Sequence, residues 1–235
     1  MLRELVIKKM IKIAEEVNSS ELLKKQLLDE SLNSNASSGM GYEKTIQAWL
    51  FSELKCEDEL KSSEYVVQFE RNMIDGKAKN IADIIIKNSG QLFNQRDADL
   101  IIELGHQHLF QYAPLSKKFM GDLNKWKEYN ALHIQIITYI RESDSGYSPD
   151  NISLSQFDRE GSVATRKASH WMNIGANNLA ELAFLNNSSD FKAENIIGNT
   201  TEKFTGKSSP AIECIFKRED ITWMFQVWFV ISERN

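Results

Sequence analysis

Residues 81–107 read IADIIIKNSGQLFNQRDADLIIELGHQ, and this stretch decides the fold. Two runs rich in Ile, Leu and Ala, over residues 79–87 and 99–104, flank a polar loop that contains Gly90. Continuous apolar runs of this length are typical of central strands with apolar contacts on both faces. The stretch therefore predicts two successive strands in the middle of a sheet.

Each of these two predicted strands carries one acidic residue within its apolar run. Asp83 interrupts the first run, and Glu103 interrupts the second. An ionised carboxylate costs several kcal/mol to bury unless a cation compensates its charge. Two such acids on successive strands therefore suggest that they share a cation.

The composition limits the classes of protein to be considered. The chain has 235 residues, 42% apolar and 26% charged, as expected for a globular protein with one large core. It has no apolar run near the roughly 20 residues that span a bilayer, and its first residues do not resemble a signal peptide. Two cysteines are too few for a disulfide framework or a cysteine-rich zinc site. We expect a cytoplasmic protein.

The formal net charge of −5 gives no general attraction to nucleic acid. Contacts to phosphate would have to come from local groups of basic residues. The candidate groups are Lys8, Lys9 and Lys12; Lys24 and Lys25; Lys117 and Lys118 with Lys125 and Lys127; and Arg166 with Lys167.

The chain divides into three segments. Helical spacing of apolar residues predicts helices over residues 2–17 and 21–32, and a Ser-, Asn- and Gly-rich linker follows them. Residues 1–39 therefore form an N-terminal helical segment with its linker. Residues 40–141 form the core, and residues 142–235 form a C-terminal extension packed on it.

The core begins with a predicted helix over residues 42–55. Glu43 has the helical spacing that places it on the apolar side of this helix. A role in a site shared with the strand acids is one interpretation. A first-turn acid that is stabilised by the helix dipole is the other.

The remaining core elements predict a mixed sheet. A strand over residues 64–73 and an Asp-Gly turn precede the two acid-bearing strands. A helix over residues 116–129 and a strand over residues 132–140 follow them. A strand, a helix and a strand in that order indicate a right-handed crossover and parallel pairing. We therefore expect an α/β (α+β) fold whose mixed sheet is flanked by helices.

The C-terminal extension contains a predicted short helix over residues 179–185 and a closing hairpin. The hairpin strands cover residues 212–217 and 221–231, and the second of them is apolar on both faces. Such a strand has to be covered by this chain or by a second copy. A homodimer through the hairpin is therefore possible.

The element order helix, three strands, helix, strand, with acids at these positions, resembles the PD-(D/E)XK nuclease superfamily, which is restriction-endonuclease-like. The resemblance covers roughly residues 40–141 and rests on pattern. It implies that Asp83 and Glu103 bind Mg²⁺ or Mn²⁺, that Glu43 adds an acid from the helix, and that DNA is the substrate. Mg²⁺ suits carboxylate ligands and supports phosphodiester hydrolysis by activating water and neutralising charge.

The family motif Glu-x-Lys would place a lysine at position 105, on the same side of the strand as Glu103. Here that position is Gly105. Three substitutes are considered. The first is a lysine from the following helix, with Lys118 preferred and Lys125 next. The second is His106 as a general base, if the strand bends at Gly105, and the third is Gln107 or Gln111 as a group that positions substrate or water. The alternative is a catalytically degenerate domain that binds nucleic acid or a protein partner.

Overall fold

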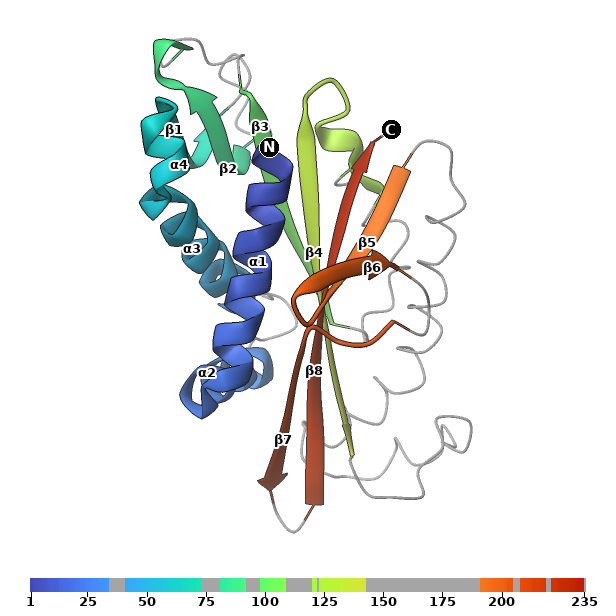
Figure 1. Cartoon of the computed structure of the whole chain (residues 1–235). Coiled ribbons are helices and arrows are strands. Elements are labelled where there is room, and N and C mark those ends of the chain that lie inside the picture. The colour runs from blue at the N-terminus through green and yellow to red at the C-terminus, as the bar shows by residue number, and fades with distance from the viewer. Residues whose placement is uncertain are drawn as a thin grey trace.

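The structure is a computed structural model. It describes residues 1–33, 41–72, 81–91, 98–108, 120–121, 123–142, 191–204, 208–218 and 221–234. A group of helices lies along one face of a long, twisted sheet (Figure 1). Because the described elements form a mixed α/β architecture with a mixed sheet, the expected fold class is confirmed at that level.

Three longer helices come from the N-terminal part of the chain. They are α1 (Leu2–Ser19), α2 (Glu21–Asn33) and α3 (Gly41–Cys56), and they confirm the helices that periodicity predicts. A short helix, α4 (Asp58–Ser62), follows α3 and was not predicted. Buried apolar residues recur along α1 and α3 at helical spacing, so each helix presents one apolar side to the sheet.

The first half of the sheet contains both acid-bearing strands. Strands β1 (Tyr65–Asn72), β2 (Ile81–Asn88) and β3 (Leu100–His108) pair antiparallel in sequence order. Strand β4 (Ala131–Glu142) pairs parallel with β3, which confirms the parallel pairing expected from the intervening helix.

The second half of the sheet is formed by β5 (Phe191–Ile197), β6 (Thr200–Lys203), β7 (Ile212–Arg218) and β8 (Ile221–Arg234). The described strands form one eight-stranded sheet in the order β1-β2-β3-β4-β8-β5-β6, and β7 also pairs with β8. The β7–β8 hairpin was predicted, whereas β5 and β6 were not.

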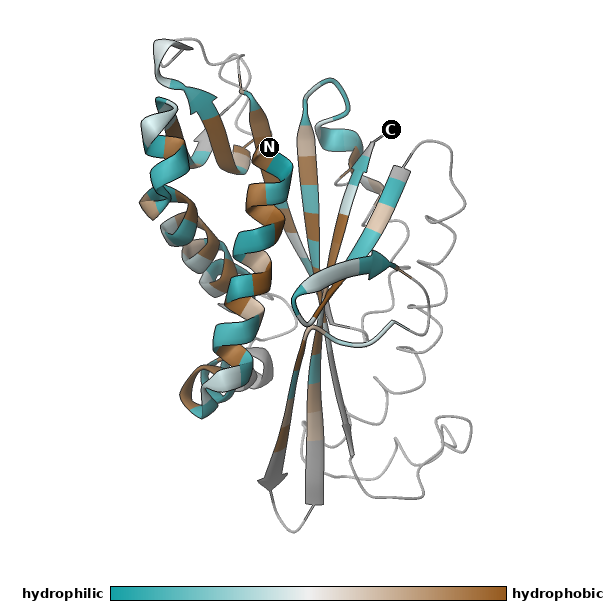
Figure 2. Cartoon of the chain, in the orientation of Figure 1, coloured by the Kyte–Doolittle hydropathy of each residue, from teal (hydrophilic) through white to brown (hydrophobic). Residues whose placement is uncertain are grey.

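The two faces of the sheet differ in what covers them. On the face that we call the helix face, α1 and α3 pack against alternate strand residues such as Ile84, Ile102 and Ile134. On the opposite face, which we call the pocket face, a smaller cluster contains Ile101 and Trp126. Figure 2 shows the brown, apolar bands along the central strands and the mixed colouring of α1 and α3.

The helix predicted over residues 116–129 is only partly within the described residues. Residues 120, 121 and 123–125 are helical, and residues 126–128 form a turn that is closed by a hydrogen bond from Tyr129 N to Trp126 O of 3.0 Å. The helix therefore ends earlier than predicted, because the chain turns there to bring Trp126 onto the sheet. The predicted helix over residues 179–185 lies outside the described residues.

The apolar strand β8 is covered by the chain itself. It pairs with β4 along one edge and with β5 and β7 along the other, and residues 225–232 are buried. The burial of this strand does not require a second copy. Among the described helices, none combines the length and apolar character that crossing a membrane requires.

Candidate functional site

Strands β2 and β3 separate at Asp83, and the candidate site lies in the resulting gap. Their paired residues run from Ile86 opposite Leu100 to Ile84 opposite Ile102 and stop there. Beyond this point, Asp83 Oδ2 accepts a hydrogen bond from the backbone N–H of Leu104 at 2.8 Å. The Asp83 carboxylate therefore lies between the strands and satisfies a donor on β3.

Strand β1 is distorted opposite Asp83. The register pairs Phe69 with Ile84 and Arg71 with Ala82, which leaves Glu70 opposite Asp83. Glu70 has a φ of 45°, in the left-handed region that non-glycine residues rarely adopt. Such a conformation costs about 1–3 kcal/mol and is held by its surroundings. The strained backbone of Glu70 and the end of the β2–β3 pairing therefore both lie at Asp83.

Helix α3 supplies the polar partners of Asp83. Gln47 Nε2 donates to Asp83 Oδ1 and to the Asp83 carbonyl oxygen, both at 3.2 Å. Lys44 Nζ lies 3.8 Å from Oδ1 and also contacts Glu70 Oε1 at 2.6 Å. One turn of α3 therefore orients the carboxylate from the helix face.

Burial, and after it the nearby charges of Glu103 and Glu43, together raise the pKa of Asp83 to about 7. The Leu104 N–H and the Lys44 ammonium act in the opposite direction without cancelling this effect. Glu103 and Glu43 therefore both disfavour the ionised form of Asp83, and we call Asp83, Glu103 and Glu43 the acidic cluster. A carboxyl group with this pKa is about half protonated at neutral pH.

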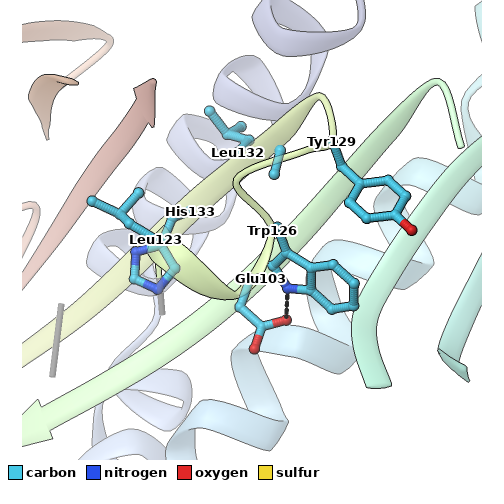
Figure 3. Close-up of a pocket in the computed structure, with 7 residues that line it drawn as sticks. Glu103, Leu123, Trp126, Tyr129, Leu132 and His133 are labelled. Carbon is cyan, nitrogen blue, oxygen red and sulfur yellow. Dashed lines mark hydrogen bonds between the residues drawn. The ribbon is translucent and has the colours of Figure 1, made fainter. Parts of the chain in front are cut away.

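Glu103 is buried on the pocket face, and both of its oxygens have partners. Trp126 Nε1 donates to Oε2 at 2.9 Å, and Lys125 Nζ forms an ion pair with Oε1. Figure 3 shows the Trp126 bond, with the Glu103 carboxylate turned toward the indole ring. Lys125 also donates to the Ile81 carbonyl oxygen at 2.8 Å. Of the two lysines suggested as substitutes for the motif lysine, Lys125 is therefore beside Glu103.

Glu43 is held by His106. Its Oε2 is hydrogen-bonded to His106 Nδ1, and an ionised carboxylate only accepts, so Nδ1 is the donor. The His106 ring packs edge-on against the buried Tyr42, with ring centroids 5.4 Å apart. His106 therefore fixes the helix acid on the helix face of the sheet.

A small pocket adjoins Glu103 on the pocket face. Its free volume of about 20 Å³ is sufficient for a water molecule. In Figure 3 the His133 ring lies beside Leu123 in this pocket. The lining residues are Glu103, Leu123, Trp126, Tyr129, Ala131, Leu132 and His133.

Three predicted site residues fall where the structure gives no side-chain description. Lys118 and Gln111 lie outside the described residues, and the side chain of Gln107 is not described. The side-chain partners of Asp83 come from α3, whereas those of Glu103 come from the segment after β3. Within the described ranges, no group of three or more His, Cys, Asp or Glu side chains is close enough to hold a metal ion.

Sequence reasoning missed the role of Gln47. This residue is completely buried and bonds both the backbone and the carboxylate of Asp83. It follows Glu43 by four positions on α3. Residues four positions apart lie next to each other on a helix. Two polar residues at this spacing on the apolar side of α3 were the signal that could have identified Gln47.

Comparison of the chain with protein-family models, curated proteins and solved structures gave no match.

Proposed function

We propose that the protein is a Mg²⁺-dependent nuclease that hydrolyses phosphodiester bonds of DNA, with a restriction-endonuclease-like αβββαβ core over residues 40–141. The observation that carries the proposal is the placement of the Asp83 carboxylate where the pairing of β2 and β3 ends, a position at which burial and the charges of Glu103 and Glu43 raise its pKa to about 7. A site that forces acids together without a bound cation is destabilising on its own. Perturbed groups of this kind are frequent at functional sites.

The donor chemistry of the acidic cluster fits Mg²⁺. The ligands would be carboxylate oxygens, which this ion prefers, and it needs only one or two of them because it retains several waters. Asp83 and Glu103 would hold the ion, and each carboxylate has unused acceptor capacity beyond its present bonds. Glu43 lies close enough to raise the pKa of Asp83 and would bind through a water molecule of the ion.

Bound Mg²⁺ supplies an activated water and neutralises negative charge on the phosphate. Hydrolysis requires that a water oxygen attacks phosphorus, that the bond to the leaving oxygen breaks, and that this oxygen takes up a proton. Lys125 is the residue of this chain that contributes positive charge beside Glu103. It would stabilise the charge that develops on the phosphate oxygens.

Cleavage of plasmid DNA in Mg²⁺ tests the proposal. We expect the wild-type protein to cut and Asp83→Asn and Glu103→Gln to lose cleavage while they remain folded. Glu53→Gln is a matched control, because Glu53 is also an ion-paired acid on α3. It lies ten residues from Glu43, about 15 Å by the helical rise. If both site variants cut like the control, the assignment is wrong.

The alternative is a degenerate nuclease-like domain that binds nucleic acid or a protein partner without cutting. Gly105 at the position of the motif lysine favours it. Calorimetric titration with Mg²⁺ and Mn²⁺ separates the two functions. Metal binding that Asp83→Asn abolishes supports the nuclease, whereas no binding at millimolar metal together with no cleavage supports the alternative.

A further inference from the structure

Gln135 on β4 lies directly beside Gly105 on β3. The parallel register pairs Gly105 with Gln135, and two residues earlier on each strand it pairs Glu103 with His133. Side chains of paired residues lie on the same face of a sheet, and residues two positions apart on a strand share that face. Gln135 therefore lies on the pocket face, two residues along the sheet from the Glu103–His133 pair.

The amide of Gln135 is buried, and none of the described residues is a hydrogen-bond partner for it. The residue is completely buried, and neither Oε1 nor Nε2 meets a hydrogen-bond partner in the part of the chain that the structure describes. The large majority of buried side-chain polar atoms in native proteins are satisfied by protein or water. An orphaned amide costs about 1–3 kcal/mol. An amide at this position therefore requires a water molecule or a polar ligand as its partner.

Buried polar atoms without hydrogen-bond partners among the described residues also occur at adjacent positions of the sheet. Val230 of β8 pairs with both Gln135 and Asn195, and Ser232 pairs with His133. Within the described residues, Asn195 Oδ1 and Ser232 Oγ are also buried without hydrogen-bond partners. Polar atoms that lack partners thus continue across the pocket face from the rung of Gly105. Water molecules or a polar ligand would satisfy them, whereas apolar packing would not.

We propose that Gln135 binds the attacking water and a non-bridging oxygen of the scissile phosphate. This inference rests on the proposed function. Gly105 has no side chain, so a side chain from a neighbouring strand has to take the place of the motif lysine. The Gln135 amide accepts a hydrogen bond from water through Oε1 and donates to phosphate through Nε2. Lys125 supplies the charge that glutamine lacks.

Two matched substitutions test this role. Gln135→Met replaces the amide with an apolar chain of similar length, and it removes two orphaned atoms. Gln226→Met makes the same change at a buried glutamine of β8 whose Nε2 does have a partner, Glu213. Cleavage rates, the KM for DNA and the thermal midpoint Tm are measured for both variants and for the wild type.

We expect opposite results from the two variants. Gln135→Met should lower kcat about a hundredfold, the loss typical of a misplaced reactant, with little change in KM and with Tm equal to or above that of the wild type. Gln226→Met should lower Tm and leave kcat unchanged.

Two results overturn the role of Gln135 alone: an unchanged kcat in Gln135→Met, or a lowered Tm as in Gln226→Met, which indicates a structural amide. In both cases, a cleavage activity that Asp83→Asn abolishes keeps the proposed function intact. A wild-type protein that does not cut DNA in Mg²⁺ or Mn²⁺ overturns the proposed function and the role of Gln135 together.

Discussion

Lys125 and Glu103 form an ion pair that joins the segment after β3 to the strand before it. The same ammonium group donates to the Ile81 carbonyl oxygen at 2.8 Å, so it also contacts β2 just before Asp83. Its position over the Trp126 ring, 5.0 Å from the centroid, restricts it further. One lysine is thus held by both acid-bearing strands at the point where they separate.

Lys125→Met should therefore abolish most cleavage. Removing one group that stabilises charge in a transition state typically lowers kcat by about 10²–10³-fold. The measurement is single-turnover cleavage of a labelled duplex in Mg²⁺. Lys125→Arg keeps the charge and should retain more activity than Lys125→Met.

Lys9→Met is the matched control for Lys125→Met. Lys9 is also a largely buried lysine in an ion pair, with Glu57 of the α3–α4 junction and Glu53 of α3. Its loss should lower Tm without changing the cleavage rate. Equal rates for the two variants would show that Lys125 contributes to folding and has no part in the reaction.

Asp83 should make the folded protein less stable as the pH rises. Its pKa of about 7 lies above the ordinary value of 3.8, so the folded state holds the proton more tightly than the unfolded state. Its contribution to stability is complete below pH 4 and is lost as the pH rises through 7. The loss amounts to about 2–4 kcal/mol.

Urea unfolding of the wild type and of Asp83→Asn between pH 4.5 and 8, without divalent metal, measures this contribution. Asparagine does not ionise, so its advantage in free energy of unfolding over the wild type should grow with pH. Comparing the two proteins cancels the opposite contributions of acids such as Glu53, whose pKa is lowered by Lys12. A constant difference across this range would show that Asp83 ionises without penalty.

Local patterns in the sequence predict most of the elements that form the site. Helical spacing locates α3, apolar runs locate β2 and β3, and the rule for crossovers gives the parallel pairing of β4. Strands β5 and β6 were missed, because their sequences FKAENII and TTEK are short and polar for strands.

The contacts within the site depend on packing that local patterns do not encode. Sequence reasoning preferred Lys118 over Lys125 as the substitute for the motif lysine, whereas the structure pairs Lys125 with Glu103 and Lys118 lies outside the described residues. The choice depends on how the helix after β3 meets the sheet. The same holds for Gln47, which reaches Asp83 across 36 positions of sequence. The raised pKa of Asp83 follows from burial and from two acids on other elements, so it required the assembled fold.

The hydrogen bond between His106 and Glu43 should contribute measurably to stability. His106→Leu leaves the Glu43 carboxylate, only 13% exposed, without its present partner. Loss of such a partner costs about 1–3 kcal/mol. Glu43→Gln should cost less, because the amide oxygen still accepts from Nδ1.

Urea unfolding of the two single variants and the double variant gives the coupling energy of the pair. We expect it to lie within the range of about 0.5–3 kcal/mol that is found for residues in direct contact. Additive effects of the two substitutions would show that the side chains do not interact in solution.

Substitutions of Glu70 test the backbone distortion of β1 opposite Asp83. Its φ of 45° suits glycine, whereas alanine pays a steric penalty of about 1–2 kcal/mol in the left-handed region. Glu70→Gly and Glu70→Ala both remove the ion pair with Lys44, so the difference in stability between the two variants isolates the effect of the backbone.

In an ordinary strand, the alanine variant is the more stable of the two by about 0.5–1 kcal/mol. We expect the opposite order here, with glycine more stable than alanine in urea unfolding. If alanine is the more stable, β1 runs regularly past Asp83, and the distortion does not contribute to the gap in which the acidic cluster lies.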